Sequence, residues 1–223
     1  MSNPDSLVQP DSAFPGAVPT QPSEHPDALD PIYQQAIEQF LRLSEDVRNT
    51  GEDASVASLA TAGRSARPSV RTVNVARISL DGFLVFADWM SGKGLQMQDN
   101  PYAALCFYWP GLHHQVIVEG EVAMLSETAS NEAWGQQQRI SGLAHWASDQ
   151  TGKPEIQQGL NLRLGDFKRR FSFEKVPRPP DWCGFLIRPQ RIEFWKTGWG
   201  RLNVRHRYHR SQEGVWILEQ ANP

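Results

Sequence analysis

The chain has 223 residues, of which 39% are hydrophobic, and its formal net charge is −3, with 22 basic and 25 acidic side chains. This length and hydrophobic content suffice for one large domain or two small ones with a buried core. The near balance of charge argues against a general nucleic-acid binder, because such proteins are usually strongly basic.

The N-terminal segment differs in composition from the rest. Residues 1–28 are rich in Pro, Ser and Asp without periodicity, so we expect a disordered or extended arm ahead of a single domain at 29–223. The arm lacks the basic and apolar regions of a signal peptide, and no run approaches the ~20 apolar residues of a membrane helix. Cys106 and Cys183 stand in apolar runs, which is typical of reduced thiols. We therefore expect a cytoplasmic protein without membrane contact.

A helix and then a series of strands are predicted next. Asp30 followed by Pro31 indicates a helix start, apolar residues recur at helical spacing to about Arg48, and Gly51 can end the helix. β-branched or aromatic runs separated by turn residues then predict strands at 54–61, 68–78, 82–89, 103–109 and 113–125. Connections this short favour an antiparallel meander or barrel, with a short helix only at 91–100.

The last part of the chain returns to helices before it ends in strands. Helices are predicted at 126–138 and 154–173, and the Pro-rich segment 176–180 ends the second. Strand-like runs follow at 183–195, 204–211 and 214–220. The layout predicts an α+β fold, an antiparallel barrel with helices packed outside.

Several common catalytic and metal motifs are absent from the sequence. There is no HExxH, CxxC, GxSxG, P-loop or GxGxxG. His113 and His114 are adjacent on a predicted strand, where they point to opposite faces and cannot chelate together. We therefore expect no metal site.

The stretch SGKG at 91–94 is a candidate anion site. It follows a predicted strand and opens a short helix, whose N-terminus offers free N–H groups. Ser91 adds a hydroxyl and Lys93 a cation, and neighbouring antiparallel strands can bring Arg71 close to Lys93. The pattern predicts a site for a phosphate dianion; the alternative is a solvated turn with surface cations.

Two amides and a basic hairpin are further candidates. Gln115 opens an apolar strand and suits the donor–acceptor edge of a flat heterocycle, and Gln150 offers a second amide. Trp195 can pack on a ring while Arg201 and Arg205 reach an anionic or carbonyl edge. Taken singly, each amide is compatible with a structural role, and the hairpin with an exposed basic turn.

Together these motifs resemble the flavin-dependent pyridoxine/pyridoxamine 5′-phosphate oxidase family. The resemblance runs from about Ala54 to Pro223 and is carried by RPSVRTV, QVIVEGE and IEFW followed by RL..R, in this order. It implies an FMN-binding split β-barrel with Greek-key-like connections. It also implies a homodimer with FMN bound at the subunit interface.

The resemblance assigns roles to individual residues. It implies that Arg71 and Lys93, with Ser91 nearby, hold the FMN phosphate, and that Arg201 and Asn203 face the substrate. The remaining cofactor-binding positions that it implies, some of them contributed by the other subunit, are Thr72, Val73, Asn74, Phe86, Ala87, Gln115, Gln150, Thr151, Trp195 and Arg205.

The chain departs from the family on the substrate side. The Lys, Tyr, Arg and His that serve a phosphorylated substrate are replaced, respectively, by Ala76, Ala133, Gln137 and Asn203. Ser141 is retained. Each lost charge-assisted hydrogen bond is worth roughly 1.5–3 kcal/mol, so a substrate without phosphate is implied. Ala76 and Trp134 instead resemble the phenazine-biosynthesis branch.

The sequence thus leads to a functional hypothesis with alternatives. An FMN oxidase would pass a hydride from a reduced nitrogen heterocycle or amine to the flavin, and O2 would accept the electrons and give H2O2. The alternatives are a pyridoxine/pyridoxamine 5′-phosphate oxidase, a non-catalytic flavin- or haem-binding protein and, last, a basic-hairpin nucleic-acid binder.

Overall fold

The fold is a closed antiparallel barrel with an extension. The computed structural model describes residues 27–148, 157–198 and 203–221. In these residues one sheet has the strand order β3-β2-β1-β4-β5-β6-β7-β8, and a further β3–β6 pairing closes the first six strands into a barrel. The strands are β1 Val56–Ala62, β2 Pro68–Ser79, β3 Gly82–Asp88, β4 Tyr102–Trp109, β5 His114–Met124, β6 Trp182–Lys196, β7 Val204–Arg210 and β8 Trp216–Ala221. The predicted antiparallel barrel is confirmed.

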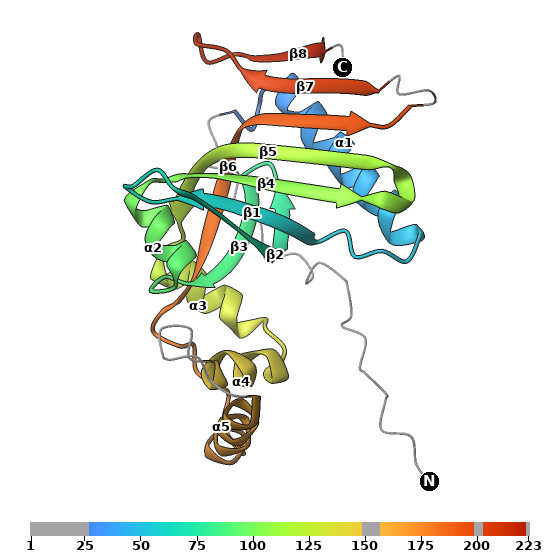
Figure 1. Cartoon of the computed structure of the whole chain (residues 1–223). Helices are drawn as coiled ribbons and strands as arrows, with labels where there is room; N and C mark the ends of the chain where they lie inside the picture. The colour runs from blue at the N-terminus through green and yellow to red at the C-terminus, as the bar shows by residue number, and fades with distance from the viewer. Residues whose placement is uncertain (1–26, 149–156, 199–202, 222–223) are drawn as a thin grey trace.

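Strand β6 belongs to both parts of the sheet. Its first half, 182–187, pairs with β3 inside the barrel, and its second half, 191–196, pairs with β7. The register of β5 against β6 shifts between Glu119 and Gly120, and such bulges bend a strand. Consequently β7 and β8 continue the sheet beyond the barrel, at the top of Figure 1.

Helix α1, Pro31–Asn49, covers one end of the barrel. Asp30 caps it by accepting hydrogen bonds from the backbone N–H of Ile32 at 2.8 Å and Tyr33 at 3.2 Å, and Gly51 follows its end with φ +86°. Phe40 is fully buried, and its ring packs edge-on against three barrel aromatics, Phe83, Phe107 and Trp109, at centroid distances of 5.0, 4.8 and 5.7 Å. The predicted helix therefore supplies a central part of the core.

Segments from the two ends of the chain are joined beside α1. The buried carboxylate of Asp27 accepts a hydrogen bond from Trp216 Nε1 at 2.9 Å and lies 3.3 Å from Arg210 Nε. Tyr208 Oη donates to Gln39 Oε1 of α1 at 2.7 Å. These contacts fix β7 and β8 to the N-terminal helix.

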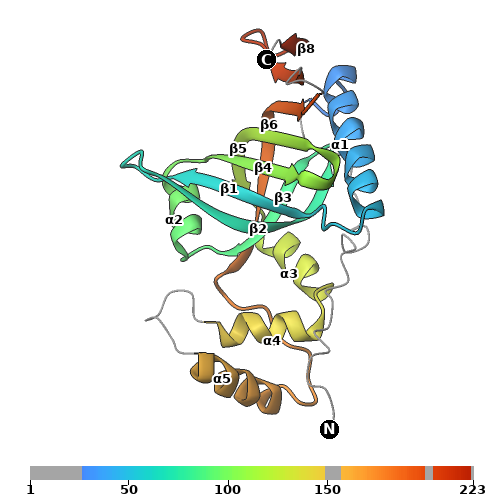
Figure 2. The ribbon, with the colours of Figure 1, turned by 45° about the vertical axis from the view of Figure 1, so that its right-hand side comes forward.

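Of the remaining helices, three lie at the other end of the molecule from β7 and β8, and α2 lies beside the barrel next to β1, as Figures 1 and 2 show. They are α2 Gly92–Asp99, α3 Glu127–Gly135, α4 Arg139–Ala147 and α5 Gln157–Arg170. The sequence predicted α2, α3 and α5 but not α4, whose small residues Gly142, Ala144 and Ala147 give only a weak apolar stripe. None of the described helices is long and apolar enough to cross a membrane.

Candidate functional site

Arg71 is held at the edge of the barrel by neutral acceptors. It lies on β2, paired with Leu59 of β1. Its Nη1 donates to Leu59 O at 3.2 Å and to Thr61 Oγ1 at 2.5 Å, and its Nη2 donates to Gln96 Oε1 of α2 at 3.0 Å. Burial lowers the pKa of Arg71 from its ordinary value. The guanidinium is thus fixed in place with its charge uncompensated by these contacts.

The start of α2 stands beside this arginine. Buried Ser91 caps the helix: its Oγ accepts from Gly94 N at 3.3 Å and donates to Asp88 O at 2.5 Å. Burial, and after it the charge of Arg71, lower the pKa of Lys93, while Asp88 opposes them. Arg71 and Lys93 are thus near enough for the charge of one to act on the other.

No carboxylate in the described part of the chain is bonded to these two cations. Neither Arg71 nor Lys93 forms an ion pair within 4.0 Å with a described carboxylate. A helix N-terminus adds N–H groups and partial positive charge at the same place. The arrangement suits a dianion such as a phosphate monoester.

A second group of predicted residues forms a row on the outer face of the sheet. Gln115 of β5 pairs with Trp195 of β6, which pairs with Arg205 of β7, and directly opposed residues of antiparallel strands share a face. The half-buried amide of Gln115 makes no hydrogen bond within the described part of the chain. An amide edge, an indole and a guanidinium are therefore presented side by side.

The predicted cofactor-binding residues of β2 lie apart from the row of Gln115, Trp195 and Arg205. Thr72 and Asn74 are exposed and share the outer face, but Val73 points the other way and packs against the core. With strands about 4.8 Å apart, β2 lies three strand spacings, or roughly 14 Å, from β5 and from β7, the latter by way of β3 and β6 round the closed barrel. Arg71 is paired with the fully buried Leu59 and so lies on the core-facing side of the sheet, whereas Arg205 lies on the outer face.

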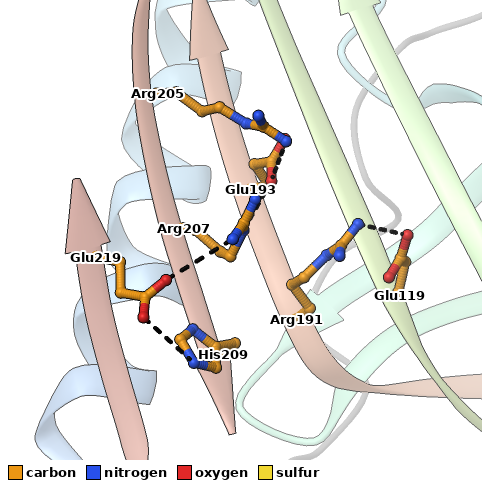
Figure 3. Close-up of polar contacts among 7 residues, drawn as sticks. All are labelled: Glu119, Arg191, Glu193, Arg205, Arg207, His209 and Glu219. Atoms are coloured by element: carbon orange, nitrogen blue, oxygen red, sulfur yellow. Dashed lines mark hydrogen bonds and ion pairs between the residues drawn. The ribbon is translucent and has the colours of Figure 1, made fainter. Parts of the chain in front are cut away.

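The outer face around Arg205 carries a charge network (Figure 3). Glu193, only 4% exposed, accepts from Arg205 Nε at 2.8 Å and Nη2 at 3.0 Å, and from Arg207 Nε at 3.0 Å. Glu219 lies 3.7 Å from Arg207 and 3.9 Å from His209. Burial raises the pKa of Glu193, but the hydrogen bonds from the two arginines outweigh it, and the net pKa is lowered.

Phe86 and Ala87 lie on β3 near an aromatic cluster. Phe86 stacks on Trp182 at a centroid distance of 4.3 Å, and Trp182 meets Trp134 edge-on at 4.9 Å. Ala87 is buried in the main core. His145 of α4 completes the cluster, 5.8 Å from Trp134, and burial followed by the charge of Lys93 lowers its pKa. This cluster therefore borders the anion site.

The predicted substrate positions are spread over several elements. Ala76 is the extra residue of a bulge in β2, where pairing with β3 skips from Val75 to Arg77. Gln137 lies in the turn between α3 and α4, and Ser141 of α4 lines a hollow of about 390 Å³ against α5. Asn203 precedes β7, and its buried Oδ1 has no partner among the described residues.

Three of the predicted site residues, Gln150, Thr151 and Arg201, lie outside the described residues. In the described ranges, no group of three or more His, Cys, Asp or Glu side chains could hold a metal ion, and both cysteines are free.

The structure adds residues that the sequence did not indicate. Thr61 and Gln96 orient Arg71, and Gln96 could have been found because it follows Lys93 by three residues on the same helix. Glu193 had a signal of its own, a carboxylate inside the apolar strand IEFW. His145 had none, because a single histidine on a helix is not informative.

Two families of sequences match the chain. One described as pyridoxamine 5′-phosphate oxidase matches residues 43–196, and one described as the pyridoxine 5′-phosphate oxidase C-terminal dimerisation region matches residues 182–223. The pyridoxine/pyridoxamine 5′-phosphate oxidase of Anaeromyxobacter dehalogenans is 39% identical over 171 residues, 77% of this chain and 86% of that protein. That of Actinobacillus succinogenes is 34% identical over 203 residues, 90% and 93% of the two chains.

Solved structures share the fold. PhzG from Burkholderia lata 383, in complex with tetrahydrophenazine-1-carboxylic acid, gives a TM-score of 0.78 at 24% identity over 89% of this chain and 96% of that one. A pyridoxamine 5′-phosphate oxidase-related, FMN-binding protein from Nostoc punctiforme gives 0.68 at 23% identity over 87% and 98%. The split-barrel prediction is confirmed by these similarities.

Proposed function

The chain belongs to the pyridoxamine 5′-phosphate oxidase family, and from this premise we propose that it is an FMN-dependent oxidase that works as a homodimer. The observation that carries the proposal is the pair of cations, Arg71 and Lys93, at the capped start of α2, to which no carboxylate among the described residues is bonded. The residues fit the phosphate of FMN, since they supply two cations, a hydroxyl and backbone N–H groups.

The outer-face row fits the ring system of the same cofactor. Gln115 offers a donor and an acceptor, Trp195 a flat surface and Arg205 donors, which are the groups that a heterocycle with carbonyl edges requires. FMN, when bound, supplies the hydride acceptor, and the protein's part is to bind, orient and shield the reacting groups.

A dimer explains why these residues are divided between two places. Since Arg71 and Arg205 of one chain lie on opposite faces of the sheet, in the proposed dimer each copy gives a phosphate end to one site and a ring-facing row to the other. The family region described as a dimerisation region, 182–223, spans β6 to β8 and includes that row.

The proposed substrate is a reduced nitrogen heterocycle or amine without phosphate, with O2 as final acceptor and H2O2 as product. Ala76, Ala133 and Gln137 are uncharged, so they offer no cation to a substrate phosphate. The PhzG complex named above contains a reduced tricyclic carboxylic acid and supports a phenazine-type step. In this proposal Arg201 binds the substrate carboxylate, and Asn203, whose Oδ1 lacks a described partner, orients a substrate N–H or hydroxyl.

A second candidate is pyridoxine/pyridoxamine 5′-phosphate oxidase itself, because relatives 33–39% identical carry that name. Steady-state oxygen uptake separates the two. We expect little turnover of pyridoxamine 5′-phosphate and clear turnover of a reduced phenazine carboxylic acid. Efficient turnover of pyridoxamine 5′-phosphate would instead establish the second candidate, and bound FMN without any substrate-dependent oxygen uptake would indicate a non-catalytic flavin protein.

The cofactor site itself is tested by FMN titration. Arg71→Met and Lys93→Met should each weaken FMN binding tenfold or more, since each removes a charge-assisted contact worth about 1.5–3 kcal/mol. The control is Arg64→Met, because the side chain of Arg64 is exposed, is paired with Asp99 and should leave binding unchanged when it is removed. Failure of the wild-type protein to bind FMN at all would refute the proposal.

A further inference from the structure

We propose that Glu193 is a positioning residue, which holds the guanidinium of Arg205 in the orientation that contacts the flavin ring. This inference rests on the proposed function, because it requires Arg205 to meet FMN. It adds a residue that does not touch the cofactor and acts only through its neighbour.

The geometry of the outer face points to this role. Glu193 pairs across the strands with Arg207, whereas Arg205 pairs with Trp195, so Arg205 reaches diagonally to the carboxylate. It uses Nε at 2.8 Å and Nη2 at 3.0 Å, a bidentate contact that fixes the plane of the guanidinium. Nη1 keeps no hydrogen-bonding partner in the described part of the chain and is available to an acceptor on a ligand.

The burial of Glu193 excludes a simple surface ion pair. The residue is 4% exposed, and a carboxylate is costly to bury unless its oxygens are bonded. Arg207 supplies the third bond, from Nε to Oε2 at 3.0 Å, so both oxygens are satisfied. Since well-packed apolar residues often stabilise a fold as well as a buried ion pair does, the pair is better explained by the orientation it imposes than by stability.

The Glu193–Arg205 ion pair would also determine the electrostatic potential at the flavin ring. Glu193 compensates Arg205, so Arg205 acts at the ring mainly as a hydrogen-bond donor rather than as a full cation. Arg207, in turn, lies near Glu219, which leaves this part of the face close to neutral. Removing the carboxylate would therefore both loosen Arg205 and increase the positive potential at the ring.

The test uses the full-length protein and FMN as the probe. Glu193→Gln keeps the size of the side chain but turns one acceptor oxygen into a donor facing the arginines, so FMN should bind about tenfold more weakly. The midpoint potential of bound FMN should rise, because added positive potential favours the reduced, more negative flavin. The matched control is Glu119→Gln, which breaks the half-exposed Arg191–Glu119 pair on the same face and should change neither quantity.

A double-mutant cycle separates positioning from a general structural effect. Arg205→Lys should weaken FMN binding by itself, and adding Glu193→Gln to it should weaken binding no further, because the partner to be positioned is already gone. Additive losses would overturn the inference. If circular dichroism shows that Glu193→Gln is unfolded, Glu193→Asp takes its place, since it keeps the charge but withdraws the carboxylate, and wild-type affinity in that variant would overturn the inference as well.

The outcomes for the two proposals are distinct. A wild-type protein that does not bind FMN refutes the proposed function and, with it, this inference. A wild-type protein that binds FMN, together with a folded Glu193→Gln variant of equal affinity and potential, refutes the role of Glu193 alone.

Discussion

Gly94 allows α2 to begin directly against the backbone of the strand before it. A Cβ at this position would stand 2.5 Å from Trp89 O, 2.6 Å from Asp88 O and 2.7 Å from Trp89 C, all of them backbone atoms. In Gly94→Ala the start of the helix must therefore move. Gly92, two residues earlier, provides a matched control in the same turn, because a Cβ there would have no atom within 4 Å.

The two substitutions should differ in their effect on the free energy of unfolding. Overpacking costs about 1–3 kcal/mol, and we expect the upper end because backbone atoms cannot rotate away. Alanine's better helix propensity returns at most about 1 kcal/mol, so Gly94→Ala should lower the free energy of unfolding by about 2 kcal/mol. Gly92→Ala meets no obstacle and should be neutral or stabilising by up to about 1 kcal/mol.

Guanidinium unfolding followed by tryptophan fluorescence measures both values, and FMN titration measures the effect on the site. Because a displaced helix start also displaces Lys93 and the Ser91 cap, Gly94→Ala should bind FMN about tenfold more weakly, which corresponds to about 1.4 kcal/mol. Gly92→Ala should bind it as the wild type does. Equal stability and equal affinity in the two variants would refute the argument that the close approach of α2 builds the anion site.

Three further predictions concern the scaffold. Phe40→Ala should lower the free energy of unfolding, measured by thermal or chemical unfolding, by about 3–5 kcal/mol. Leu41 is 40% exposed on the same helix, so Leu41→Ala should stay within about 0.5 kcal/mol of wild type. Similar losses in the two variants would contradict the assignment of Phe40 to the core. Asp27→Asn should cost about 1–2 kcal/mol, because it weakens the bond to Trp216 that joins the chain ends. The lowered pKa of Glu193 stabilises the fold above its ordinary pKa of 4.5, and this contribution disappears as the pH falls through the folded value; Glu193→Gln should flatten that part of an unfolding-against-pH curve.

The fold was predictable where the signals are local. Asp30 with Pro31 marked the start of α1, and short turn-bounded runs predicted the antiparallel strands to within two residues at each end. The helix α4 was not predicted, because Gly142 and its alanines do not form a clear apolar stripe and its burial depends on Trp134, which lies against it. Such a helix is stabilised mainly by packing against other elements, and these contacts cannot be recognised from the local sequence pattern.

The sequence was enough to predict which residues belong to the candidate site, but not where they lie relative to one another. The cations of the anion site and the row from Gln115 to Arg205 came from sequence motifs and a family resemblance. Their separation along the sheet follows from strand order, which is set by long-range pairing. Likewise the two neighbours Arg71 and Thr72 face opposite sides of β2, so residues adjacent in sequence serve different parts of the site.

The bulge at Ala76 has a consequence for how this enzyme family can change. Because the pairing of β2 with β3 passes from Val75 directly to Arg77, Ala76 sits where the hydrogen-bond ladder is already interrupted. Its side chain therefore has no directly opposed partner on β3 whose packing a larger residue would disturb. Under the proposed function, in which Ala76 faces the substrate, a substitution there would change the substrate side of the site while the pairing of β2 with β3 is kept.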